Sequence, residues 1–164
     1  MQETQQFVAK TFAGLESILA EELRELGATD VVETFRAVEF KGTTETMYKA
    51  NYQARTAIRI LKPIAEFEAE DETEFYRAVS KINWTKYLSL EKTFAVDSTV
   101  SNSNMTHSKY VSLKTKDAIV DQFNRKFGKR PDVDTDFPDL RINIYLKENH
   151  CTLSFDSSAI SLHK

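Results

Sequence analysis

A basic stretch in the C-terminal half of the chain holds the residues best suited to contact a phosphate backbone. Residues 109–130 contain seven cations against two acids, Asp117 and Asp121, so this stretch has a net charge of +5. The whole chain has a net charge of −3, and the other residues together therefore carry −8. Local clusters of Lys and Arg supply most of the affinity for nucleic acids. The seven cations are Lys109, Lys114, Lys116, Arg125, Lys126, Lys129 and Arg130.

A polar loop precedes this basic stretch. Residues 101–108 are rich in hydroxyl and amide side chains and lead into the start of a predicted helix. Free N–H groups at a helix N-terminus bind phosphate, and polar side chains contact RNA backbone and 2′-OH groups without reading the base sequence. The two segments together predict a surface that recognises RNA shape, with Tyr110 as a candidate for base stacking.

We predict nine RNA-contacting residues from this pattern. Six are cations for phosphate groups, and three supply polar contacts: Lys109, Lys114, Lys116, Lys126, Lys129 and Arg130, with Ser101, Asn102 and Ser103. An ordinary solvated helix face explains the same charges, and charge alone does not decide between these interpretations.

Helical spacing over residues 111–127 gives this stretch an apolar arc as well. Lys116 projects into the arc near the helix start, so it must extend to solvent or meet a partner there. Gly128 is a suitable helix stop, with Pro131 just beyond it. The apolar arc consists of Leu113, Ile119, Val120, Phe123 and Phe127.

Catalytic and cofactor motifs are absent from the sequence. The chain has four glycines, and none are close enough to form a Gly-rich loop for a nucleotide or for S-adenosylmethionine. Cys151 is the single cysteine and lies on an apolar strand pattern, which favours a core position over a nucleophile. We therefore assign no catalytic, cofactor-binding or metal-binding residue.

Two acidic segments contain enough carboxylates for a metal site. Asp132, Asp134 and Asp136 alternate, but the glycine and glutamate of a calcium-binding EF-hand loop are not at the required positions. Six acids fall within residues 66–74, which suits a solvated linker that leads into a helix N-terminus. Asp71 and Glu74 have the spacing of a capping box there. A metal-dependent enzyme or a surface for a basic protein partner remains an alternative for these acids.

The elements that position these residues fall into two groups. Residues 7–10, 31–35, 37–41 and 57–61 have strand character, and helices are predicted over 15–26 and after Gly42. The order strand, helix, strand, strand, helix, strand is the ferredoxin-like βαββαβ arrangement. Pro63 is expected to end the regular pairing, with a domain boundary near residue 67.

The second half is also mixed α/β. We predict strands over 94–100, 142–146 and 151–155, helices over 75–82 and 111–127, and a β-hairpin turn at Glu148-Asn149. The fold class is therefore α+β. The single cysteine suits a reducing compartment, the N-terminus lacks a signal-peptide pattern, and no apolar run is long enough to span a membrane. Together these features favour the cytoplasm.

The second half resembles the THUMP domain. The resemblance lies in Thr93-Phe94-Ala95-Val96-Asp97 through Ser101-Asn102-Ser103, in residues 107–121, and in Arg130-Pro131. It is strongest to bacterial THUMP-containing methyltransferases that modify guanine N2 of large-subunit ribosomal RNA, a group often labelled N6-adenine-specific DNA methylases. The first 65 residues, with Gly14-Leu15-Glu16 before a helix, resemble the ferredoxin-like domain that precedes THUMP in that family.

The resemblance implies a ferredoxin-like domain over 1–66, a THUMP RNA-binding domain over 67–157, and the start of a connector over 158–164. The family continues into a methyltransferase domain with a Gly-rich cofactor loop and an Asn-Pro-Pro-Tyr-like motif, and neither occurs here. We therefore expect this chain to be the substrate-binding part of the enzyme. S-adenosylmethionine and the catalytic residues are expected in a domain outside these residues.

The expected partners are structured RNA, foremost large-subunit ribosomal RNA, and the methyltransferase domain of the same full-length chain. Three other functions remain open at this point. The chain could be a stand-alone RNA-binding adaptor, a THUMP module for tRNA modification, or a protein–protein interaction module.

Overall fold

The structure is a computed structural model that describes residues 3–101 and 108–158. The chain divides into two compact units. The first contains the described residues up to Pro63 together with those from Asp156 onward, and the second is Ile64–Phe155. No helix of the described residues is long and apolar enough to cross a membrane.

The first unit has the predicted ferredoxin-like order. Its strands pair antiparallel in the order β2-β3-β1-β4, which places β1 between β3 and β4. One face of the sheet is apolar, and both helices pack on it around Phe7, Leu19, Phe40 and Met47. The elements are β1 (Gln5–Lys10), α1 (Glu16–Glu25), β2 (Thr29–Thr34), β3 (Ala37–Gly42), α2 (Thr44–Gln53) and β4 (Arg59–Glu68).

The prediction that Pro63 ends the regular pairing is wrong. Strand β4 continues through Pro63 to Glu68, and its last residues belong to the second unit. Proline lacks only the N–H donor, so a strand can pass through it where that donor is not needed. The linker interpretation of residues 66–74 is therefore also wrong for Glu66 and Glu68, which are strand residues.

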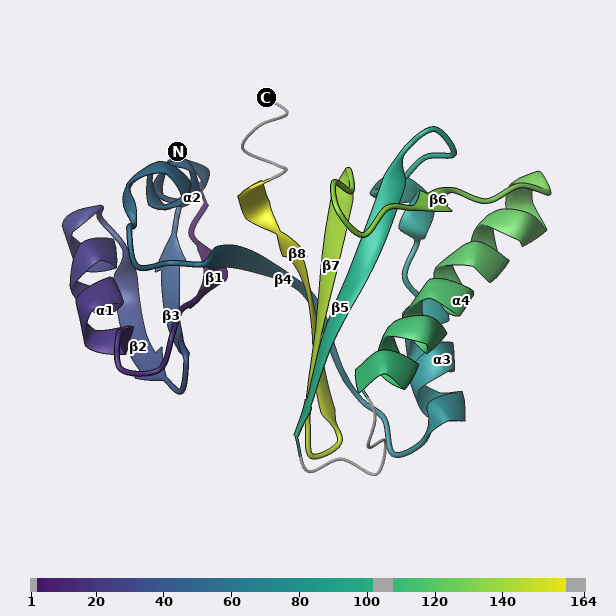
Figure 1. Ribbon diagram of the computed structural model, residues 1–164, viewed down its shortest axis with the longest axis horizontal. Coiled ribbons are helices and arrows are strands. Elements are labelled where there is room, and N and C mark those ends of the chain that lie inside the picture. The colour runs from purple at the N-terminus through teal and green to yellow at the C-terminus, as the bar shows by residue number, and fades with distance from the viewer. Residues whose placement is uncertain (1–2, 102–107, 159–164) are drawn as a thin grey trace. The chain divides into compact units, whose positions relative to one another are not determined.

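The second unit is a sheet covered on one face by two helices (Figure 1). Strand β5 pairs in parallel with both β6 and β7, and β7 and β8 form the predicted antiparallel hairpin. Glu148 adopts a φ of 57° in the hairpin turn. The elements are α3 (Glu72–Ser80), the 3₁₀ turn η1 (Trp84–Lys86), β5 (Thr93–Ser101), α4 (Ser108–Phe127), β6 (Asp132–Val133), β7 (Leu140–Lys147) and β8 (His150–Asp156).

Asp71 begins helix α3 as its N-cap. Its side chain accepts a hydrogen bond from the Glu74 backbone N–H at 2.9 Å. The carboxylate of Glu74 in turn accepts from the backbone N–H of Glu70 at 2.9 Å. Because both contacts satisfy otherwise free N–H groups, these acids fix the start of α3.

The second core is anchored by Trp84, which is fully buried. Its indole N–H donates to the Val79 carbonyl at 3.0 Å. The backbone N–H of Trp84 donates to the side-chain oxygen of Gln122 on α4 at 2.8 Å. The side-chain N–H groups of Gln122 in turn donate to the carbonyls of Ser80 and Ile82. The segment after α3 is therefore tied directly to the helix that carries the basic stretch.

Candidate nucleic-acid interface

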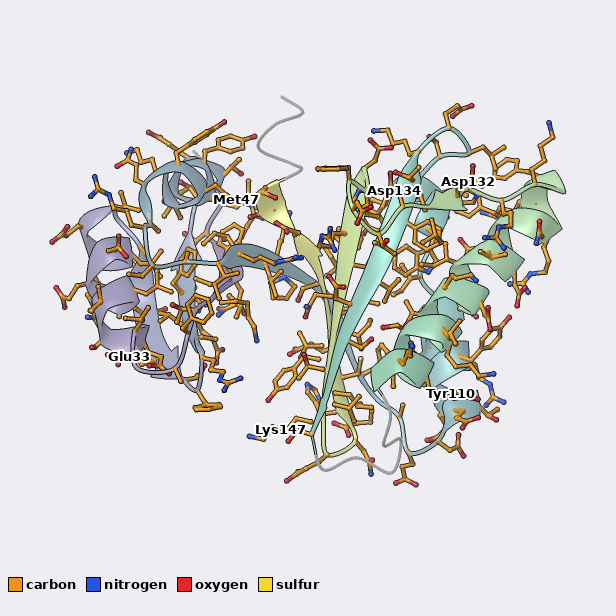
Figure 2. All side chains as sticks on the ribbon, in the orientation of Figure 1. Glu33, Met47, Tyr110, Asp132, Asp134 and Lys147 are labelled. Carbon is orange, nitrogen blue, oxygen red and sulfur yellow. The ribbon has the colours of Figure 1, made fainter. Side chains whose placement is uncertain are left out.

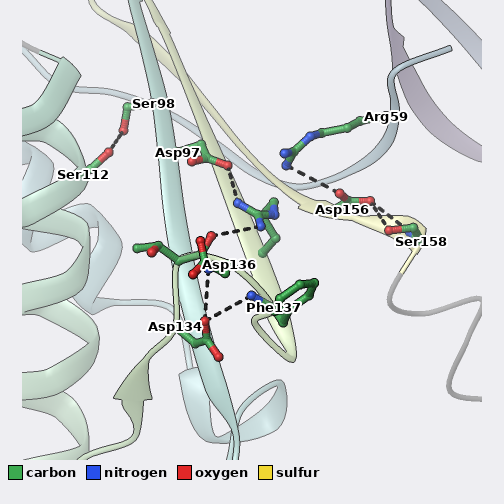
Figure 3. A network of polar contacts seen from close by, with 11 residues as sticks. Arg59, Asp97, Ser98, Ser112, Asp134, Asp136, Phe137, Asp156 and Ser158 are labelled. Atoms are coloured by element: carbon green, nitrogen blue, oxygen red, sulfur yellow. Dashed lines mark hydrogen bonds and ion pairs between the residues drawn. The ribbon is translucent and has the colours of Figure 1, made fainter.

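Helix α4 is held against the sheet by its buried residues. Val111, Thr115, Ala118 and Ile119 are fully buried, and Phe123 is nearly so. The hydroxyl of Ser112 shares a 2.6 Å hydrogen bond with that of Ser98 on β5 (Figure 3). The orientation of α4 is therefore fixed, and the cations on its outer side occupy defined positions.

The predicted apolar arc of α4 is only partly correct. Ile119, Val120 and Phe123 are buried, but Leu113 and Phe127 are each about half exposed. Leu113 lies at one margin of the arc, and Phe127 is the last residue of the helix. Lys116 is partly exposed, so it extends to solvent although it lies within the arc.

The cations do not form a single patch. Helix α4 has 20 residues, which corresponds to about 30 Å at a rise of about 1.5 Å per residue. Lys109, Lys114 and Lys116 lie in its first half. Lys126 lies in its last turn, and Lys129 and Arg130 follow the helix. One RNA segment would have to extend along the whole helix to contact both groups.

Lys114 lies on the flank of α4 that faces α3. Its ammonium group is 5.6 Å from the centre of the Tyr110 ring, and the Tyr110 hydroxyl donates to the Glu72 carboxylate of α3. This hydrogen bond is the main cause of a raised pKa at Tyr110. Figure 2 shows Tyr110 at the start of α4 beside α3. Because an acid already lies near Lys114, it is a weaker candidate for phosphate contact than the other predicted cations.

The C-terminal cations are accessible, as is Lys109 at the start of the helix. Lys126, Lys129 and Arg130 are exposed, and none forms an ion pair within the described part of the chain. Gly128 ends the helix with a φ of +67°, and its N–H donates to the Asn124 carbonyl at 2.9 Å. A left-handed glycine redirects the chain sharply, so Lys129 and Arg130 project beyond the end of the helix.

An open pocket of about 240 Å³ is lined in part by Phe127, which follows Lys126 in the sequence. It is lined by Leu88, Leu90, Phe123 and the half-exposed Phe127, together with polar groups of the segment after η1. Because Glu91 lines the pocket and no cation does, the pocket itself does not favour a phosphate.

The predicted polar loop is only partly within the described residues. Ser101 ends β5, and its carbonyl accepts the backbone N–H of Glu148 at 2.7 Å. Asn102 and Ser103 lie outside the described residues, as does His107. The structure therefore places one of the three predicted polar contacts, at the edge of the sheet next to the β7–β8 turn.

Lys147 is a candidate that the sequence analysis missed. The parallel pairing of β5 with β7 sets Lys147 directly opposite Ser101. Figure 2 shows Lys147 at the end of the sheet, and its side chain is exposed. A single exposed lysine in a strand gives no sequence signal by itself. Only the register between two strands distant in sequence adds this cation to the surface near Ser101.

Asp134 and Cys151 both have structural roles. The Asp134 carboxylate accepts the backbone N–H groups of Asp136 and Phe137 at 3.0 and 3.1 Å, which closes a turn (Figure 3). Burial raises the pKa of the Cys151 thiol to about 12, so the reactive thiolate is scarce at neutral pH. Among the described residues, no group of three or more metal-ligating side chains comes together.

His150 joins β8 to the acids of β4. Its Nδ1 lies 2.7 Å from the Glu68 carboxylate and its Nε2 lies 3.5 Å from that of Glu66. The hydrogen bond with Glu68 is the largest cause of a raised pKa at His150, partly offset by desolvation, and the Glu66 contact adds to the rise. The imidazole is therefore protonated at a higher pH than a free histidine, whose pKa is about 6.5.

We expect His150→Gln to remove a pH-dependent part of the stability. The pKa of His150 is raised in the folded state. Its contribution to the free energy of unfolding is therefore fully present below the pKa of the unfolded state and is lost as the pH rises through the pKa of the folded state. The pair is half exposed, so the effect should stay below about 1 kcal/mol. Urea titrations at pH 5.5 and pH 8.5 should show a larger stability difference between wild type and variant at pH 5.5. An equal difference at both pH values would contradict this assignment.

Comparison with known proteins identifies both units. Residues 69–156 match the model of the THUMP domain. The chain belongs to the THUMP family. Residues 6–61 match a second model, the RlmL ferredoxin-like domain. The THUMP match contains α3, β5 and α4, and so it includes every cation of the predicted interface.

Several known proteins are similar to nearly the whole chain. The "Ribosomal RNA large subunit methyltransferase K/L" of Syntrophotalea carbinolica is 42% identical over 96% of the chain. A Synechocystis protein named "Putative RNA methyltransferase slr0064" is 39% identical over 98% of it. The solved structure of "SMU.472, a putative methyltransferase complexed with SAH" aligns over 95% of the chain with a TM-score of 0.77 and 30% identity.

These relatives are much longer than the present chain. The THUMP-containing chain spans 22% of the Syntrophotalea protein, 42% of the Synechocystis protein and 42% of the SMU.472 chain. The similarity is thus confined to one part of each relative, the part with the ferredoxin-like and THUMP domains.

Proposed function

We propose that this chain is the RNA-binding, substrate-recognition part of an RNA methyltransferase. The observation that carries the proposal is the group of exposed cations, Lys126, Lys129 and Arg130, at the end of the helix of a THUMP domain. They lack ion-pair partners among the described residues. Exposed cations that no acid neutralises are available to replace the counterions of a phosphate backbone.

The relatives support a more specific form of this proposal. One of them is named a ribosomal RNA large subunit methyltransferase. We infer that the present chain grips structured large-subunit ribosomal RNA in the cytoplasm and presents a guanine for N2 methylation. The S-adenosylmethionine-dependent chemistry belongs to a catalytic domain outside these residues. The proposed division is a ferredoxin-like domain over 1–66, a THUMP domain over 67–157, and a connector that begins at 158.

The proposal predicts salt-dependent binding of the chain to RNA. Binding to large-subunit ribosomal RNA fragments should weaken linearly on a log–log plot against salt concentration, because each phosphate contact releases a counterion. Fluorescence anisotropy at several salt concentrations measures the slope, with a structured tRNA and a DNA duplex as comparison ligands. Stronger binding to the ribosomal fragments than to DNA is the expected result. An absence of binding at low salt would overturn RNA recognition by this chain.

A further inference from the structure

The first unit exposes a cluster of apolar and cationic side chains at one end of its sheet. Phe12 is 65% exposed and Phe35 is 76% exposed, and Ile58 is half exposed. They lie in three different connections, namely β1–α1, β2–β3 and α2–β4. Isolated exposed apolar residues need no explanation, but several gathered at one place indicate a binding surface.

Hydrogen bonds hold these three connections together. The backbone N–H of Thr11 donates to the Arg36 carbonyl at 2.9 Å, and the Thr11 hydroxyl donates to the Thr56 carbonyl at 2.6 Å. The backbone N–H of Ile58 donates to the Lys10 carbonyl at 2.8 Å. Because Phe12 follows the buried Thr11 and Phe35 precedes Arg36, both phenylalanines extend from a fixed base.

Glu16 reinforces this base from helix α1. Its carboxylate accepts the backbone N–H of Gly14 at 2.8 Å and that of Arg36 at 2.9 Å. The hydrogen bond from Arg36 is the main reason that the pKa of Glu16 is lowered. One acid thus joins the β1–α1 connection to the β2–β3 turn through backbone groups.

The β2–β3 turn has an unusual sequence for its geometry. It consists of Phe35 and Arg36, and Arg36 has a φ of 60°. Two-residue hairpin turns with positive φ strongly favour Asn and Gly, which adopt this conformation at low cost. Phe35 packs little of its surface, so burial of its side chain contributes little to the stability of the fold.

The cluster combines an aromatic face with positive charge. The Arg36 guanidinium lies 5.0 Å from the centre of the Phe35 ring. Lys10 is close by, since it is the register partner of Ala37, the residue that follows Arg36. Arg59 is the register partner of Lys10 on the neighbouring strand, and its guanidinium forms an ion pair with Asp156 at 3.6 Å. A flat ring beside a guanidinium matches a nucleotide, which offers a base to stack on the ring and a phosphate to the guanidinium.

We propose that Phe12, Phe35 and Arg36 form a second RNA contact, which stacks unpaired nucleotides of the RNA that the THUMP domain binds. The inference rests on the proposed function, and it assigns to the ferredoxin-like domain a preference for single-stranded RNA. An apolar protein partner fits less well, because the cations border the aromatic rings. Stacking on aromatic side chains tolerates every base, so this contact adds affinity without sequence preference.

The test uses two RNA hairpins with the same duplex. One is blunt, and the other has a single-stranded 3′ tail of about six nucleotides, within the site size of known single-strand binding surfaces. The tail contains 2-aminopurine, whose fluorescence falls when it stacks. The wild-type chain should bind the tailed hairpin more tightly and quench its fluorescence. The double variant Phe12→Ala/Phe35→Ala should bind the tailed hairpin about tenfold more weakly, lose the quench, and bind the blunt hairpin as wild type does.

Matched controls separate this contact from general effects. Tyr52→Ala removes another exposed aromatic residue of the same unit, 71% exposed on α2, and should leave both affinities unchanged. Arg36→Gln should weaken binding of the tailed hairpin and lower its salt dependence. If wild type binds both hairpins and the double variant matches it, the stacking contact is wrong while RNA binding stands. If wild type binds neither hairpin, the proposed function fails as well. Loss of self-association in the variant, without an RNA effect, would assign the surface to a second copy.

Discussion

Replacing Lys126, Lys129 and Arg130 together by alanine should lower the slope of log affinity against log salt concentration by roughly 2 to 3. Each of the three cations is exposed at the end of α4 and lacks an ion-pair partner among the described residues. Three surface charge contacts of about 0.2–1 kcal/mol each correspond to a loss of affinity of about 3- to 140-fold. Anisotropy titrations with a ribosomal RNA fragment measure both quantities.

A charge-matched triple variant provides the control for this experiment. Arg24, Lys41 and Lys49 lie on the first unit and pair with Glu21, Asp30 and Glu45 at 2.8, 3.4 and 3.4 Å. Their replacement by alanine changes the net charge equally, yet it should alter the salt slope much less. Equal slopes for the two triple variants would show that only bulk charge matters and would remove the end of α4 from the interface.

Lys114→Ala offers a graded comparison on the same helix. Its ammonium lies over Tyr110, whose hydroxyl contacts Glu72. The loss of RNA affinity should therefore be smaller than for Lys129→Ala, and the same titrations check the order of the two effects. A larger effect at Lys114 would place the RNA along the α3-facing flank of α4 instead.

Trp84→Ala should destabilise the second unit by about 3–5 kcal/mol, the usual cost of truncating a fully buried large aromatic residue. Trp84 packs near Tyr87 and Phe155, with ring centres 6.4 and 6.1 Å away. Its indole also satisfies the Val79 carbonyl. Urea unfolding followed by far-ultraviolet circular dichroism measures the change, since the variant lacks the only tryptophan of the chain.

Phe137→Ala is the control for this stability experiment. Phe137 belongs to the same unit but is 87% exposed, and substitutions at such positions usually change stability by no more than about 0.5 kcal/mol. A Trp84→Ala variant as stable as Phe137→Ala would mean that the segment after α3 does not anchor α4.

Local sequence patterns were sufficient to predict most of the helices and strands. Leu19 and Leu23 repeat at helical spacing, and Phe7, Val38 and Phe40 fit strands with one buried face. These periods reflect which face of each element is buried, so they are present in the residues themselves. The ferredoxin-like order and the long basic helix could therefore be predicted from the sequence.

The misjudged positions depend on neighbours distant in the chain. Pro63 remains in β4 because the strand needs no donor there, and Glu68 becomes a strand residue beside His150. Phe35 fits a strand pattern, yet it stands in the turn after β2. Propensity could not distinguish these outcomes, because each depends on which other segment supplies the hydrogen-bond partner.

The sequence by itself determined the type of surface, a basic helix in a chain of net negative charge, because charge and apolar spacing are local properties. Only the tertiary structure decided how that charge is distributed. Tyr110, whose ring lies near the Lys114 ammonium, contacts Glu72 of α3, and the parallel β5–β7 register sets Lys147 opposite Ser101. Hydrogen bonds among three connections likewise assembled Phe12 with Phe35. Such proximities arise from packing between distant segments, whose free energy no local pattern contains.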